Sequence, residues 1–194
     1  MGFTREQLKQ QYGREVPDLL PDPLRLLFVG INPSLRSAAT GAHFSGSGNR
    51  FYPALHRAGI TGHLIRAANG FSDDDLAELT SRGIGITNLW PEATARADEL
   101  TREQLRTGRD RLTATVAEHR PTVVAVVGIT AYRTAFGLPR ATTGEQESPW
   151  EGTRLFAAPN PSGLNAHSSV DDLARAYGEI AEAAGIAAES SAAG

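Results

Sequence analysis

Asparagine residues stand where three apolar runs of the sequence end, and their positions favour a shared site. In an open parallel sheet, ligands bind beyond the carboxyl ends of the strands, so the three following loops are expected to meet. An amide side chain offers both a donor and an acceptor, which suits the edge of a flat heterocycle. For any one of them, simple turn formation is the more ordinary explanation, but it accounts less readily for three asparagines at one edge. The runs and their asparagines are "LRLLFVG" (24–30) with Asn32, "GIGITNLW" (83–90) with Asn88, and "TRLFAAP" (153–159) with Asn160.

Residues 31–50, after the first apolar run, are rich in Gly, Ser, Asn and Pro and predict a long loop. A loop of that length inside a small domain usually has a function. Phe44 in this loop could stack on a flat ring, or it could be a core residue that folds the loop back onto the sheet. A neutral site of amides, hydroxyls and backbone N–H groups suits a reaction whose leaving group becomes an anion.

The elements that must position these residues alternate between apolar strands and segments with helical spacing. Four strands separated by helices predict an α/β fold, a single-domain three-layer sandwich around a central, mainly parallel four-stranded sheet. Thr101-x-x-Gln104 is a capping pattern that opens the longest helix. We expect an N-terminal extension (1–23), one domain (24–185) and a disordered tail (186–194).

Composition narrows the class of protein. The chain has 194 residues, 40% of them hydrophobic and 21% charged, which is ordinary for one soluble domain. It contains no cysteine, no apolar run long enough to cross a membrane and no signal-peptide core, so we expect a cytoplasmic protein without a membrane partner. A net charge of −3 argues mildly against a wide nucleic-acid surface. Whether the protein binds nucleic acid then depends on local patches of basic residues.

Familiar catalytic sets are missing from the sequence. There is no Gly-x-Ser-x-Gly elbow and no Walker loop, and the five histidines lack metal-ligand spacing, so neither a metal nor a cofactor is expected. No pair of carboxylates follows the strands in question, which argues against the two-carboxylate plan of sugar hydrolases.

Two long motifs resemble those of the mismatch-specific uracil/thymine-DNA glycosylases, within the uracil-DNA glycosylase superfamily. "GINPSLRSAATGAHFSGSGNRFYPAL" (30–55) is similar to the first family motif, and "PNPSGL" (159–164) to the second. The segment "GIGITNLWPEATARADEL" (83–100) resembles the region between them. The resemblance runs in consistent order over 24–185. It implies a uracil-DNA glycosylase-like fold, with the DNA site at the strand ends.

The resemblance also implies roles for individual residues. Asn32 matches the catalytic asparagine, which positions the water that attacks the sugar C1′. Phe44 matches the aromatic residue that stacks on the flipped base, and Asn88 matches a base-reading position. Leu164 matches the wedge pushed into the duplex. The further substrate-binding candidates are Ile31, Ser37 and Asn160, and the further DNA-binding candidates are Ser162 and Gly163. Apart from the resemblance, Arg36, Arg50 and His167 flank the Asn-Pro-Ser segments (32–34 and 160–162) and are the candidates for phosphate contacts with DNA.

The sequence departs from the family pattern at three places. Ser34 replaces a glycine of the first motif and is expected to narrow the base pocket. The segment around Ala166 lacks an arginine that some members carry, which predicts weaker duplex contacts. "PEAT" (91–94) lacks the Arg-Pro of the family.

Together these features predict a monofunctional DNA glycosylase that excises uracil, and related pyrimidines such as thymine, from G·U-type mismatches in double-stranded DNA. We expect it to act as a monomer and without a cofactor. Asp98 is the first alternative for the catalytic role. Two other classes stay open: a small-molecule nucleoside or nucleotide hydrolase or transferase on the same edge, which the net charge favours slightly, and a non-catalytic DNA- or nucleotide-binding module.

Overall fold

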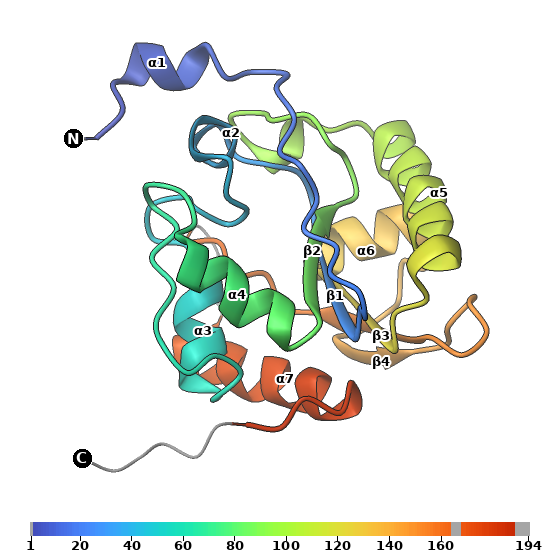
Figure 1. The fold of residues 1–194 in the computed structure, drawn as a ribbon. Coiled ribbons are helices and arrows are strands. Elements are labelled where there is room, and N and C mark those ends of the chain that lie inside the picture. Colours follow the sequence, from blue (N-terminus) through green and yellow to red (C-terminus); the bar gives the residue numbers. More distant parts are fainter. Residues whose placement is uncertain (1, 164–167, 189–194) are drawn as a thin grey trace.

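A five-stranded sheet with the order β2-β1-β3-β5-β4 forms the centre of the molecule (Figure 1). The structure, a computed structural model, describes residues 2–163 and 168–188. Four strands are parallel, and the short β4 runs antiparallel to β5. The predicted α/β class and mainly parallel sheet are therefore confirmed. The strands are β1 (Leu26–Gly30), β2 (Ile84–Asn88), β3 (Val123–Val127), β4 (Gly144–Gln146) and β5 (Arg154–Ala158).

The sequence predicts four strands, but the sheet has five, because the edge strand β4 was not predicted. β4 consists of Gly, Glu and Gln, and it is largely exposed, so it leaves no apolar run in the sequence. Pairing with β5 creates it, and the Glu145 carboxylate accepts two hydrogen bonds from the Arg154 guanidinium, at 2.7 and 2.9 Å. Tertiary contacts decide this strand rather than local propensity.

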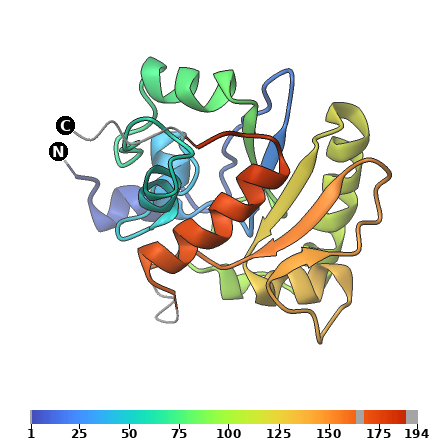
Figure 2. The same cartoon turned by 90° about the horizontal axis from the view of Figure 1, so that it is seen from below.

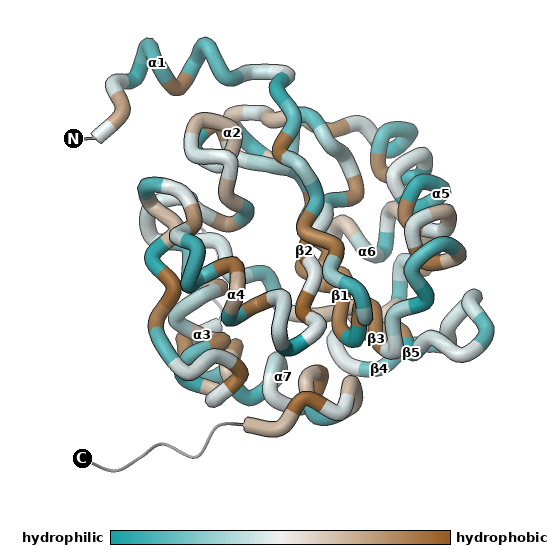
Figure 3. The backbone as a smooth tube through the Cα atoms, viewed as in Figure 1, coloured by the Kyte–Doolittle hydropathy of each residue, from teal (hydrophilic) through white to brown (hydrophobic). Residues whose placement is uncertain are grey.

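Helices cover both faces of the sheet, as Figure 2 shows. Alternate residues of each buried strand point to opposite faces, so Leu26 and Phe28 of β1 pack against α3, α4 and α7, whereas Leu27 and Val29 pack against α5 and α6. Figure 3 shows the strands as an apolar centre between more polar helices. The helices of the two layers are α3 (Phe51–Arg57), α4 (Asp73–Ser81), α5 (Arg102–His119), α6 (Ile129–Phe136) and α7 (Val170–Ala183).

The helix starts follow the sequence signals closely. Thr101 forms the predicted capping box with Gln104 at the start of α5. The acidic runs 73–75 and 171–172 lie in the first turns of α4 and α7, where negative charge suits the helix dipole. A short 3-10 turn, η1 (Ala97–Glu99), precedes α5.

Helix α2 (Leu35–Thr40) lies within the segment predicted as a long loop. The prediction is wrong for these six residues because α2 has no apolar stripe: Ser37 is its only buried residue. Ser34 caps the helix, its hydroxyl accepting from the Ser37 backbone N–H at 3.1 Å.

The predicted N-terminal extension is partly joined to the sheet. Helix α1 (Arg5–Lys9) buries no residue, but Leu19 and Ile86 exchange two backbone hydrogen bonds beside β2, at 2.9 and 2.8 Å. At the other end, Ile186 is 6% exposed and packs in the core, although the tail was expected to be disordered from that residue onward. Within the described ranges, no helix is long and apolar enough to span a membrane.

Candidate functional site

The carboxyl ends of the parallel strands bring the three asparagine-bearing loops to one edge of the sheet. Gly30 and Asn88 are register partners at the ends of β1 and β2. The pairing continues past the strands, since the backbone N–H of Trp90 donates to the Ile31 carbonyl at 3.0 Å. A Cβ placed on Gly128, after β3, would lie 3.2 Å from Ile31 and 3.7 Å from the Asn160 amide. The glycine thus leaves room for both side chains.

Three acceptors hold the Asn32 amide nitrogen. Nδ2 lies 2.7 Å from the Thr94 hydroxyl and 3.2 Å from the carbonyls of both Glu92 and Pro33. Because the Thr94 hydroxyl donates its proton to the Arg96 carbonyl at 2.7 Å, it can only accept from Asn32. The amide orientation is therefore fixed, with Nδ2 turned toward these groups and Oδ1 left as an acceptor for a ligand or a water molecule.

Asn88 is held in a similar way, by His43. The Asn88 amide nitrogen lies 3.1 Å from His43 Nδ1, and His43 Nε2 lies 2.9 Å from the Pro17 carbonyl. A Cβ on Gly30 would lie 2.4 Å from Asn88 Oδ1 and 3.3 Å from the Phe44 ring. Only glycine at this position lets the amide oxygen and the ring meet above the end of β1.

Phe44 packs against the core, which is one of the two roles that the sequence left open, and its stacking on a flat ligand ring stays a prediction. Its ring stacks on Phe51, with centroids 4.0 Å apart and an interplanar angle of 24°, and it packs against the core. The side chain is nevertheless only partly buried. Its φ of +54° is unusual for a residue with a side chain. Strained backbone of this kind gathers at functional sites, where the surrounding structure maintains it.

The loops that contain the two Asn-Pro-Ser segments, 32–34 and 160–162, pack against each other. The Arg50 backbone N–H donates to the Pro161 carbonyl at 2.9 Å, and its guanidinium donates to the carbonyls of Ser162, at 2.7 Å, and Ser168. A Cβ on Gly163 would lie 2.8 Å from the Gly48 carbonyl oxygen, so the backbones are in close contact.

The second loop also has an internal brace. The Asn160 Oδ1 accepts from the Ser162 backbone N–H at 2.9 Å, which forms a tight turn at the start of the loop. Leu164 and His167, expected as the wedge and as a phosphate contact, lie outside the described residues, as does Ala166.

The remaining site candidates make contacts within the protein. The Ser34 and Ser37 hydroxyls are 3.0 Å apart, and Ser37 is 2% exposed. The Arg36 guanidinium donates to the Ala68 carbonyl at 3.0 Å and lies over the Phe3 ring. Asp98 is exposed and paired with Arg96.

Comparison with known proteins identifies the family. The model of the uracil DNA glycosylase superfamily matches residues 17–181. This chain belongs to the uracil DNA glycosylase superfamily. The solution NMR structure of a candidate uracil DNA glycosylase from Methanosarcina acetivorans has a similar fold, with a TM-score of 0.62 and 16% sequence identity. The match covers 88% of this chain and 98% of that one.

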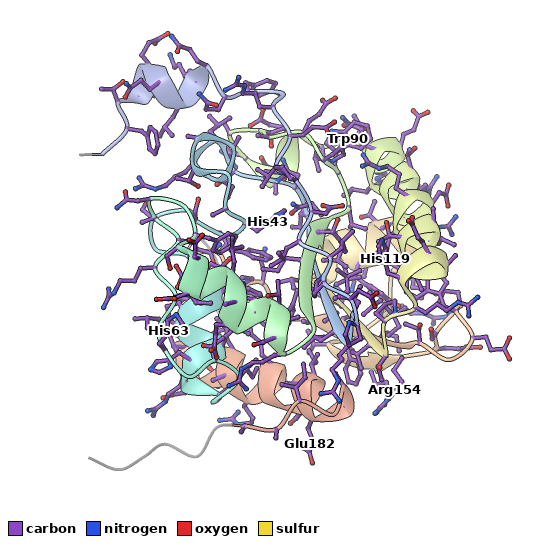
Figure 4. All side chains as sticks on the ribbon, in the orientation of Figure 1. His43, His63, Trp90, His119, Arg154 and Glu182 are labelled. Carbon is purple, nitrogen blue, oxygen red and sulfur yellow. The ribbon has the colours of Figure 1, made fainter. Side chains whose placement is uncertain are left out.

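The sequence did not predict two residues of the candidate site, Thr94 and His43. Thr94 belongs to "PEAT" (91–94), whose distinguishing feature in the sequence is the arginine it lacks, and the spacing of His43 speaks only to metal binding, which it does not favour. Position is the signal that could have found them, because each lies in a loop that follows one of the adjacent strands β1 and β2. Figure 4 shows His43 near the site end of β2, whereas His63, in the loop between α3 and α4, and His119, the last residue of α5, lie away from it.

Two hollows of the protein are lined by residues other than Asn32 and Asn88. A cavity of about 560 Å³ runs along α4, lined by acidic residues such as Asp74 and Glu78. A second, of about 320 Å³, lies behind Ile31 toward α6. Among the described residues, no group of three His, Asp or Glu could hold a metal ion.

Proposed function

We propose that this protein is a monofunctional DNA glycosylase that hydrolyses the N-glycosidic bond of uracil in DNA, with G·U mismatches as its preferred substrate and no cofactor. The observation that carries the proposal is the fixed amide of Asn32. Its nitrogen donates to Thr94, Glu92 and Pro33. Its oxygen therefore keeps one fixed position, in which it can accept a hydrogen bond from water. An acceptor held in place next to the sugar can orient an attacking water molecule without removing a proton beforehand.

Neutral groups suffice for this reaction because the leaving group is stabilised rather than protonated. As the glycosidic bond breaks, the sugar acquires oxocarbenium character and uracil leaves as an anion, which fixed N–H donors stabilise. Asn32 orients the water and does not act as a strong base. We therefore expect modest rates, and a preference for bases that leave easily.

Base recognition is assigned to the space above Gly30. Phe44 would stack on the extruded base, while Asn88 would bind its polar edge; both side chains meet at Gly30. A base must leave the duplex to reach this edge, and a mismatched pair opens at the lowest cost. That physical difference supports the proposed preference for G·U. The wedge role of Leu164 rests on the sequence resemblance alone.

A lyase step is not part of the proposal. Schiff-base chemistry at the sugar needs a lysine, and the one lysine of the chain, Lys9, is in α1. Hydrolysis by water is the reaction that the residues at the strand ends support.

The test measures release of uracil from labelled duplexes containing G·U, A·U or G·T, and from single-stranded DNA containing uracil. We expect the fastest excision from G·U. Asn32→Ala should abolish excision and leave duplex binding largely intact, because it removes the water-orienting group and no phosphate contact.

Asp98→Ala is the matched control, since its exposed carboxylate is engaged by Arg96. It should retain excision. If Asp98→Ala rather than Asn32→Ala loses activity, the catalytic role moves to the carboxylate. Release of bases only from free nucleosides would instead indicate a small-molecule hydrolase.

A further inference from the structure

His43 links the N-terminal segment to Asn88 through both of its ring nitrogens. It is 2% exposed. Its Nε2 lies 2.9 Å from the Pro17 carbonyl, and its Nδ1 lies 3.1 Å from the Asn88 amide nitrogen. The backbone is held too, since the Tyr52 hydroxyl donates to the His43 carbonyl at 2.8 Å.

These contacts determine the tautomer of the ring. A carbonyl oxygen can only accept, so Nε2 must carry the proton that it donates to Pro17. An amide nitrogen can only donate, so Nδ1 must be the unprotonated acceptor for Asn88. The ring is therefore neutral and protonated at Nε2. Burial lowers the pKa of His43, despite the opposing effects of the Pro17 hydrogen bond and the Asp18 carboxylate, which agrees with a neutral ring.

The tautomer in turn determines which way the Asn88 amide faces. With Nδ2 directed at His43, Oδ1 occupies the other position, next to Gly30 and Phe44. In the described structure this is the only side-chain hydrogen bond of Asn88. Without His43, no other side-chain hydrogen bond in the described structure would distinguish the two amide orientations.

We propose that His43 is a positioning residue that selects uracil over cytosine by fixing the orientation of the Asn88 amide. The proposal rests on the proposed glycosylase function. Uracil presents an N3–H donor beside the O4 acceptor, which match Oδ1 and the second N–H of Asn88. Cytosine presents the opposite pattern, an N3 acceptor beside an N4 donor, so two acceptors and two donors would face each other.

Two substitutions separate the two hydrogen bonds of His43. In His43→Gln, the amide nitrogen can take the place of Nε2 and donate to Pro17, but no acceptor stands at the Nδ1 position. In His43→Asn, the amide oxygen can take the place of Nδ1 and accept from Asn88, but the bond to Pro17 is lost. Thermal unfolding of both variants measures how much stability each substitution removes, separately from its effect on excision.

We expect His43→Gln to lower the ratio of uracil to cytosine excision about tenfold, the effect of losing one orienting hydrogen bond. His43→Asn should keep the ratio close to that of the wild type. Equal loss of uracil excision in both variants with an unchanged ratio would overturn the proposal, because packing alone would then explain His43.

Nitrogen-15 spectra of histidine in the unmodified protein test the tautomer directly, whether or not the variants fold. The expected result is a neutral ring protonated at Nε2 near neutral pH; protonation at Nδ1 would refute the inference. If the wild type excises no uracil from any duplex, the proposed glycosylase function fails, while the spectra still decide whether His43 orients Asn88.

Discussion

Thr94→Val tests whether the orientation of Asn32, and not merely its presence, sets the rate of excision. The Thr94 hydroxyl accepts from Asn32 at 2.7 Å and donates to the Arg96 carbonyl at 2.7 Å. Thr94 is 7% exposed. Valine keeps the shape of the side chain but removes the oxygen, so both hydrogen bonds disappear with little change in packing.

The structure allows the size of the effect to be worked out. Each neutral hydrogen bond contributes about 1 kcal/mol net, so losing two should lower the free energy of unfolding by about 2 kcal/mol. Asn32 keeps its two longer bonds, both 3.2 Å, to Pro33 and Glu92. The amide should therefore be loosened rather than released. If the looser amide raises the activation free energy by about 1.4 kcal/mol, the rate of excision falls about tenfold. This decrease is far smaller than the decrease in rate expected for Asn32→Ala.

Single-turnover excision of uracil from a G·U duplex, with the enzyme in excess, isolates this step from product release. Thr94→Ser is the matched control, because it keeps the hydroxyl and removes only a methyl group. Duplex affinity should be the same in both variants. A wild-type rate in Thr94→Val would refute the orienting role of Thr94, and an equal rate loss in Thr94→Ser would assign the effect to packing.

Three other changes test separate parts of the site. Gly30→Ala places a Cβ 2.4 Å from Asn88 Oδ1, so the rate of excision should fall about tenfold or more. A denaturation curve should show that the variant still folds, with a free energy of unfolding about 1–3 kcal/mol below that of the wild type. Arg50→Gln removes contacts to the second loop and should weaken duplex binding, with the slope of log affinity against log salt changing by less than about one unit; a full unit would assign a phosphate contact. Burial raises the pKa of Asp75, but hydrogen bonds from Ser72 and His63 outweigh it, so the net pKa lies below the ordinary value of 3.8. The unfolded chain then holds this proton more tightly, so the stability advantage of wild type over Asp75→Asn should be full above pH 5 and shrink as the pH falls through 4 and below; a gap in melting temperature that is constant with pH would contradict this.

The parts of the fold that leave a local pattern were predictable from the sequence. Runs such as "VVAVV" (123–127) are apolar throughout because both faces of a parallel strand are buried. Helix α5 begins at the capping pattern of Thr101 because the unpaired N–H groups of a helix start need such a side chain. The convergence of three asparagines followed from the shared direction of parallel strands.

The parts that depend on distant partners were not predictable. Strand β4 exists through its pairing with β5, and α2 is held by a polar cap instead of an apolar stripe. Thr94 accepts a hydrogen bond from Asn32, which lies 62 positions away in the sequence. His43 contacts Asn88, which lies 45 positions away. No periodicity or spacing rule reaches across that separation, so only the folded sheet reveals them.

The two asparagines of the site are braced crosswise by the loops of neighbouring strands. Asn32 follows β1 and is oriented by Thr94, which lies after β2. Asn88 ends β2 and is oriented by His43, which lies in the loop after β1. Because β1 and β2 are adjacent and in register at Gly30 and Asn88, each strand leads to one amide of the candidate site and to the residue that holds the other amide. A neutral amide has two orientations of similar intrinsic energy, so a site built from amides requires such bracing to present one donor and acceptor pattern.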